Sequence, residues 1–150
     1  MPTVTTRLLL FSRQFERFYE HQFTPLLERT GLTMREIHVL LFLANNPDYD
    51  TARDVAEYRG LVKSQVSQAV DLLATQGLLR RTPDGTDRRM VHLSITEAGA
   101  PLAREAQVIQ ADCGRRLLAN FSPEDEVQFR RLLETVLENG THLMEEEARP

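Results

Sequence analysis

The segment from Leu78 to Leu93 constrains the fold most, because it contains the predicted β-hairpin of an otherwise helical chain. Leu78–Thr82 and Arg89–Leu93 are rich in β-forming residues and flank a loop with the composition Pro83-Asp84-Gly85-Thr86-Asp87. Elsewhere, apolar residues recur at three- and four-residue steps, which indicates amphipathic helices. The chain therefore predicts a mainly α fold with a small β-wing.

Capping signals divide the rest of the chain into helices. Thr24-Pro25 predicts a bend or restart, and Gly31 and Gly60 predict helix ends. Three segments have the spacing of a capping box: Thr33 with Glu36, Thr51 with Asp54, and Ser94 with Glu97. The predicted helices cover about residues 5–22, 24–31, 33–46, 51–59, 63–76, 94–120 and 122–144.

Two of these helices, Thr51–Arg59 and Lys63–Gln76, are joined at Gly60 by a short turn, as in a helix-turn-helix. Such a pair alone also fits two core helices of any small α protein. The apolar residues of the second helix share one face: Val66, Ala69, Val70 and Leu73. Short polar residues near its start can approach base edges, with Lys63 on a phosphate: Ser64, Gln65, Ser67 and Gln68.

The distribution of charge favours nucleic acid although the net charge is −4. Residues 59–92 carry a balance of +3, so the rest of the chain carries −7. The local field at a surface matters more for DNA than the net charge of the chain. Within that segment, Arg88 and Arg89 place two planar cations at the predicted turn, a geometry that suits a minor groove. A winged helix that binds protein is the alternative, and it requires no such arginine pair.

The chain resembles the MarR family of bacterial winged helix-turn-helix regulators. The resemblance spans the chain in element order, and its specific part lies between Thr51 and Gly99. The matching segments are Gly31-Leu32-Thr33, Ala56 to Gly60, Lys63 to Ser67 with Leu73, Gly77-Leu78, and Asp87-Arg88-Arg89 through Leu93, Thr96 and Gly99.

The resemblance implies one domain over residues 1–150, with a winged helix-turn-helix at about 33–94 and dimerisation helices at about 5–30 and 95–144. It implies a homodimer that binds a pseudo-palindrome in double-stranded DNA and responds to a small-molecule effector. It also implies that Arg89 enters the minor groove and that Asp87 supports the wing by pairing with an arginine. Two positions depart from the family: Val62 replaces a capping serine, so the helix can begin at Ser64, and Gln68 and Leu72 replace basic residues.

Other functional classes lack support in the sequence. There is no nucleophile elbow, phosphate loop or metal-hydrolase motif, so we expect no enzyme, no catalytic residue and no cofactor. The four histidines and Cys113 show no close ligand pair, so we expect no metal site, and Cys113 lies on an apolar stripe as a buried, inert thiol. The single cysteine, the absence of a signal peptide and the absence of a long apolar run predict a cytoplasmic protein without a membrane partner.

Overall fold

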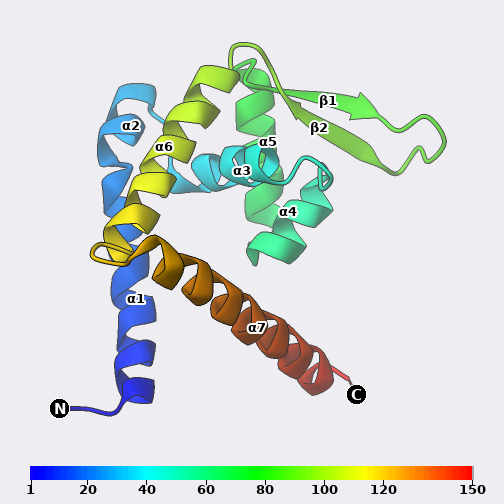
Figure 1. Cartoon of the computed structure of the whole chain (residues 1–150). Helices are drawn as coiled ribbons and strands as arrows, with labels where there is room; N and C mark the ends of the chain where they lie inside the picture. Colours follow the sequence, from blue (N-terminus) through cyan, green and yellow to red (C-terminus); the bar gives the residue numbers. More distant parts are fainter. Residues whose placement is uncertain (150) are drawn as a thin grey trace. The chain divides into compact units, whose positions relative to one another are not determined.

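The structure is a computed structural model that describes residues 1–149, and within that range it contains seven helices and one two-stranded sheet (Figure 1). This composition confirms the prediction of a mainly α fold with a small β-wing. The elements are α1 (Val4–Gln22), α2 (Thr24–Thr30), α3 (Met34–Asn45), α4 (Ala52–Arg59), α5 (Lys63–Thr75), β1 (Leu79–Pro83), β2 (Val91–Ile95), α6 (Ala100–Leu117) and α7 (Pro123–Glu147).

The chain forms two compact units, residues 1–113 and the residues from 114 onward. The first unit contains the hydrophobic core, to which α3 contributes an unbroken run of buried residues from Glu36 to Leu43. Helices α4 and α5 pack on α3, with Val55 of α4 and Leu73 of α5 fully buried. The predicted apolar face of α5 is confirmed, because each of its four residues is buried.

Local capping sets the starts and ends of these helices. The Thr33–Glu36 and Thr51–Asp54 boxes both form, and Gly31 and Gly60 both adopt the left-handed conformation that ends a helix. Helix α5 begins at Lys63, so the start at Ser64 that the resemblance allowed was wrong. Val62 is the N-cap of α5 and makes no side-chain capping bond.

The hairpin β1–β2 is antiparallel and pairs Leu79 with Ile95 and Pro83 with Val91. In Figure 1 it projects beyond α3, α4 and α5. The predicted second strand, Arg89–Leu93, was placed two residues too early, because β2 begins at Val91 and Arg89 lies in the turn. Within the turn, the Met90 amide donates to the Asp87 carbonyl at 3.1 Å, and the Arg89 amide donates to the Asp87 carboxylate at 2.9 Å.

The predicted capping box of Ser94 with Glu97 was wrong, because Ser94 lies in β2 and the next helix begins only at Ala100. The Thr96 hydroxyl accepts from the Gly99 amide at 3.1 Å, and the Thr96 carbonyl accepts from the Ala100 amide at 2.9 Å. A Cβ atom at Gly99 would lie 2.3 Å from the carbonyl oxygen of Leu78, so only glycine fits here without a shift of the backbone. This junction fixes where the strand turns into α6, which ends at Leu117 rather than near Asn120.

The second unit consists mainly of α7, which begins at a capping box formed by Ser122 and Asp125. Helix α7 has no buried residue, and its large apolar side chains are exposed, among them Leu132, Val136 and Leu137. Among residues 1–149, no helix is both long and apolar enough to cross a membrane. Whether the two units act as the single domain predicted from the sequence stays a prediction.

Candidate nucleic-acid interface

The exposed face of α5 carries the polar residues that the sequence singled out. The buried face of α5 packs against α3 and α4, so the opposite face is exposed to solvent. The exposed residues of that face near the start of the helix are Lys63, Ser64, Gln65, Ser67 and Gln68. The structure therefore brings all five predicted residues of this helix onto one accessible surface.

Gln68 is held by a residue that the sequence did not single out. The Arg35 guanidinium donates from Nη1 to Gln68 Oε1 at 2.9 Å and from Nε to Glu36 Oε1 at 3.0 Å. The Glu36 side chain is only 1% exposed, and its other oxygen accepts from the Thr33 amide at 2.8 Å. Burial raises the pKa of Glu36, but the hydrogen bonds from Thr33 and Arg35 outweigh burial and lower it overall. A buried, ionised carboxylate thus orients Arg35, and Arg35 orients the amide of Gln68.

The turn of the wing is built around the carboxylate of Asp84. Its Oδ2 atom accepts from the Thr86 amide at 3.0 Å, from the Thr86 hydroxyl at 3.0 Å and from the Asp87 amide at 2.9 Å. The amide of Asp87, the side chain of His92 and the two groups of Thr86 hold the pKa of Asp84 well below its usual range. Asp84 therefore stays ionised at any physiological pH and keeps the turn closed.

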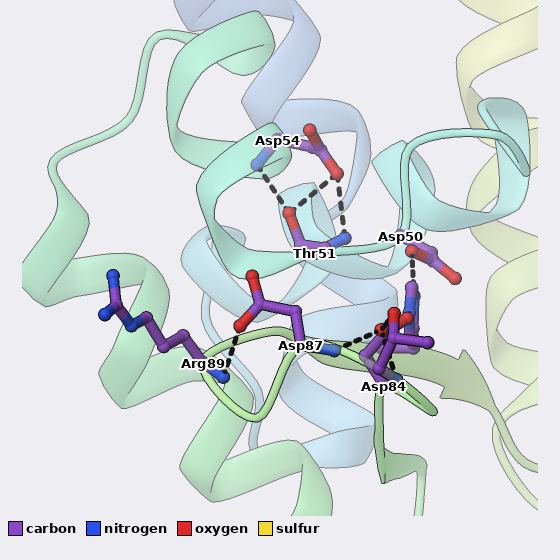
Figure 2. Close-up of polar contacts among 8 residues, drawn as sticks. Asp50, Thr51, Asp54, Asp84, Asp87 and Arg89 are labelled. Atoms are coloured by element: carbon purple, nitrogen blue, oxygen red, sulfur yellow. Dashed lines mark hydrogen bonds and ion pairs between the residues drawn. The ribbon is translucent and has the colours of Figure 1, made fainter.

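Arg88 and Arg89 both lie exposed in this turn, as predicted. The Asp87 Oδ1 atom accepts from the backbone amide of Arg89 at 2.9 Å, and Figure 2 shows the Arg89 side chain extending away from that contact. The resemblance had implied that Asp87 pairs with an arginine side chain. Within residues 1–149, Asp87 instead supports the wing through the main chain, and neither guanidinium takes part in an ion pair. Both guanidinium groups remain accessible to a ligand.

The base of the wing is tied to the helices at two points. Arg81 of β1 forms an ion pair with Asp71 of α5. On the other strand, the Leu93 amide donates to the carbonyl of Asp50 at 2.7 Å, and the His92 ring contacts the Asp50 carboxylate. Sequence reasoning missed Arg35, Asp50, Asp84 and His92 as parts of this surface. Only Asp84 had a local signal, the turn composition around Gly85, whereas the other contacts join residues 33 or more positions apart.

Within residues 1–149, the histidines and the cysteine belong to no group of three or more His, Cys, Asp or Glu side chains able to hold a metal ion. The Cys113 side chain is buried, in agreement with the expected buried thiol. His38 lies between Arg59 and Glu20, where burial and then the Arg59 charge lower its pKa to about 4.

Comparison with known proteins agrees with this geometry. The family model described as MarR family matches residues 30–90, which include α3, α4, α5, β1 and the turn with both arginines. The homoprotocatechuate degradative operon repressor of Escherichia coli is 26% identical over 141 residues, which are 94% of this chain and 93% of the relative. The chain is thus similar to MarR-family proteins over most of its length, and to the family model over residues 30–90.

Solved structures of MarR proteins share the fold of this chain. A MarR transcriptional regulator from Methanosarcina mazei superposes with a TM-score of 0.76 at 21% identity, covering 93% of this chain and 99% of the other. The S. aureus MepR–DNA complex gives a TM-score of 0.68 at 22% identity, covering 91% of this chain and 96% of the other. These matches extend well beyond residues 30–90, so the likeness in fold is not confined to that segment.

Proposed function

We propose that this chain is a sequence-specific DNA-binding transcriptional regulator that acts as a homodimer and represses its target genes. The observation that carries the proposal is the pairing of two exposed surfaces: the polar face of α5 and the turn with Arg88 and Arg89. A helix with short polar residues suits the major groove, and a protruding arginine suits the narrow, electronegative minor groove. The MarR relatives named above are a repressor and a DNA complex, which supports the same function.

The contacts of Gln68 refine its proposed role. A glutamine can pair with adenine through both its oxygen and its NH₂ group. Here Oε1 already accepts from Arg35, so the NH₂ group is the part of Gln68 best placed for a base. We infer that Gln68 donates to an acceptor on a base edge, such as a purine N7, while Arg35 fixes its direction.

The homodimer is proposed from apolar surface that the single chain leaves uncovered. In the first unit, Leu8, Leu9 and Leu10 of α1 are 60%, 66% and 55% exposed. In the second unit, Leu132 and Leu137 of α7 are 54% and 57% exposed. Exposed apolar surface on this scale marks a protein interface. The dimer would present two α5 helices and two wings to half-sites about one helical turn apart.

Selection of binding sites from a pool of random duplexes tests the DNA-binding function. We expect enrichment of one pseudo-palindrome with half-sites about 10 base pairs apart. Gln68→Ala should relax the preference at one position per half-site, at a cost of about 1–3 kcal/mol. The matched control is Gln14→Ala, which removes an exposed glutamine of α1 and should leave the selected sequence unchanged. A pool without any enriched sequence would leave the protein-binding winged helix as the better reading.

A small-molecule effector and a cytoplasmic location belong to the same proposal. The effector is inferred from the resemblance to the MarR family. We propose a small, partly apolar compound of the aromatic-acid type, in keeping with the operon named for the E. coli relative. Arg13 and Arg17 of α1 are candidate partners for an acidic group, although both are exposed arginines that also fit a purely solvated role. A screen of aromatic acids that changes neither the melting temperature nor the DNA affinity would indicate a constitutive regulator. We propose no catalytic role, because the relatives are described as regulators.

A further inference from the structure

His92 is the second residue of β2, and its ring lies between two carboxylates from different parts of the chain. Its Nδ1 atom is 2.7 Å from Asp50 Oδ1, and its Nε2 atom is 2.7 Å from Asp84 Oδ1. Asp50 belongs to the loop between α3 and α4, whereas Asp84 belongs to the turn of the wing. We call Asp50, His92 and Asp84 the His92 bridge. One imidazole ring thus joins the wing to the helix-turn-helix.

The geometry of the bridge bears on how many protons the ring carries. An ionised carboxylate only accepts hydrogen bonds, and a neutral imidazole has a single N–H to donate. Only the doubly protonated cation can donate to both carboxylates at once, so this geometry favours that form of the ring. The hydrogen bond to Asp84, and then the one to Asp50, raise the pKa of His92 above its ordinary value.

Loss of the second proton would place a carboxylate oxygen against a nitrogen lone pair. The three groups would then carry a net charge of −2 instead of −1. Asp84 would lose the hydrogen bond from His92. The other oxygen of Asp84 accepts from the amides of Thr86 and Asp87, and these two hydrogen bonds close the turn. A hollow of about 440 Å³ lies between the start of α4 and the wing, with Arg53 and Arg89 among its lining residues. Because of this hollow, side-chain packing between α4 and the wing would not hold the wing in place if the bridge were lost.

Most other charged groups on the elements around β2 have partners of their own, whereas Arg80 and the two wing arginines form no ion pair within residues 1–149. Those with partners of their own are Arg35 and Glu36 with each other, His38 with Glu20 and Arg59, Arg53 with Glu57, Asp54 with Thr51, Arg81 with Asp71, and Asp87 with the Arg89 amide. Arg80 shares the face of the hairpin with His92, because Thr82 is paired with His92 and Arg80 with Ser94. Its positive charge opposes protonation of His92, but the two carboxylates in direct contact outweigh it.

We propose that His92 is a proton-dependent positioning residue for the wing: the His92 bridge holds the turn with Arg88 and Arg89 in its DNA-binding position, and loss of the second proton releases it. The proposal rests on the DNA-binding function proposed above. The direction of the pH effect follows from the charges. The protonated bridge has hydrogen bonds to both carboxylates, and it is less negative beside DNA than the deprotonated bridge. DNA affinity therefore falls as the pH rises through the pKa of His92.

The first test uses the protein without DNA. It therefore shows whether the His92 bridge is protonated and orders the turn, independently of the proposed function. Nitrogen NMR of ¹⁵N-labelled histidine follows both ring nitrogens of His92 from pH 5 to pH 9, and hydrogen exchange follows the Thr86 and Asp87 amides. We expect both nitrogens to be protonated up to a pH above 6.5, the ordinary pKa of histidine. The protection factors of the two amides should fall at least about threefold as His92 titrates, a modest local opening. A ring that titrates at or below the ordinary value, or protection factors that do not change, would overturn the proposal.

The second test measures affinity for a fluorescein-labelled 30-base-pair duplex of mixed sequence, by anisotropy at constant salt from pH 5.5 to pH 9. The wild-type affinity should fall about three- to tenfold, the effect of one unit charge per wing at a screened distance from DNA. Asp50→Asn should abolish most of this pH dependence, because an asparagine NH₂ can donate to Nδ1 while the neutral ring donates from Nε2 to Asp84. His92→Ala should bind weakly and with little pH dependence. His142→Gln is the matched control, since the His142 side chain is 76% exposed on α7, and it should keep the wild-type profile.

The two tests separate the possible failures. An Asp50→Asn variant that keeps the full pH dependence would assign that dependence to other groups and overturn the proposal. A protonated bridge combined with pH-independent DNA affinity would overturn it as well. No binding to any duplex at any pH would refute the proposed DNA-binding function, while the NMR and exchange data would still decide whether the bridge positions the wing.

Discussion

Replacement of the wing arginines should change how DNA affinity depends on salt. Arg88 and Arg89 are exposed in the turn between β1 and β2, and neither forms an ion pair within the described part of the chain. Each guanidinium is therefore available to neutralise a phosphate and to release counterions from DNA. We expect Arg88→Ala and Arg89→Ala each to lower the salt dependence of binding rather than only the affinity at one salt concentration.

The magnitude follows from the number of contacts that each variant loses. One phosphate contact contributes about −0.9 to the slope of log K against log salt, and a dimer has two wings, so each single variant should lose about 1.8. Between 50 mM and 200 mM salt, that difference corresponds to about 12-fold in affinity. Wild type should thus lose about 12-fold more affinity than either variant over this range.

Fluorescence anisotropy with one labelled duplex at five salt concentrations measures the slope. Arg104→Ala is the matched control, because it removes an equal charge from the exposed surface of α6, outside the proposed DNA interface. Its slope should equal that of wild type. Wing variants with unchanged slopes, or an Arg104 variant with the same loss, would show that the wing does not contact phosphates and that net charge sets the salt dependence.

Four further predictions concern the wing, the core and the dimer. Asp87→Ala should weaken DNA binding about threefold or more, because it removes the acceptor that holds the Arg89 amide in the turn. Asp87→Asn keeps an acceptor oxygen and should bind DNA at least as well as wild type. Fluorescence anisotropy compares the two variants. Gly99→Ala should cost about 2 kcal/mol and lower the melting temperature by about 4–8 °C, because its Cβ would meet the Leu78 carbonyl oxygen, and calorimetry measures this loss. The pKa of His38 is lowered to about 4 in the folded protein, so the unfolded chain binds a proton to this ring at a higher pH than the folded chain does. The free energy of unfolding should therefore fall by about 2 kcal/mol between pH 7.5 and pH 5. Urea unfolding measures this fall, which should be absent in His38→Gln. Leu137→Glu should produce monomers in sedimentation equilibrium at micromolar concentration, because it charges the apolar surface of α7, and an unchanged mass would place the interface elsewhere.

Much of the candidate interface could be predicted because its elements are defined by residues close in sequence. The capping boxes at Thr33 and Thr51 join residues three positions apart, and both form as the sequence indicated. The helical period of the apolar residues in α5 fixed which face would be buried and left Gln65 and Gln68 exposed. The turn composition likewise placed Arg88 and Arg89 at the exposed end of a hairpin.

The errors in local structure arose where a local pattern competed with strand pairing. Ser94 and Glu97 have the spacing of a capping box, but Ser94 is paired with Arg80 in the ladder. The strand therefore continues to Ile95, and Thr96 takes over the capping of the helix that follows. Arg89 is excluded from β2 because the Asp87 carboxylate holds its amide within the turn.

The sequence by itself determined the helices, their buried faces and the presence of an arginine-bearing wing, because each depends on interactions within a few residues along the chain. Only the tertiary structure decided which side chains support that interface. Arg35 meets Gln68 from 33 positions away, and His92 meets Asp50 from 42 positions away. No periodicity or spacing encodes such contacts, since they exist only after α3, α5 and β2 have packed on a common core and brought distant polar groups to hydrogen-bond distance.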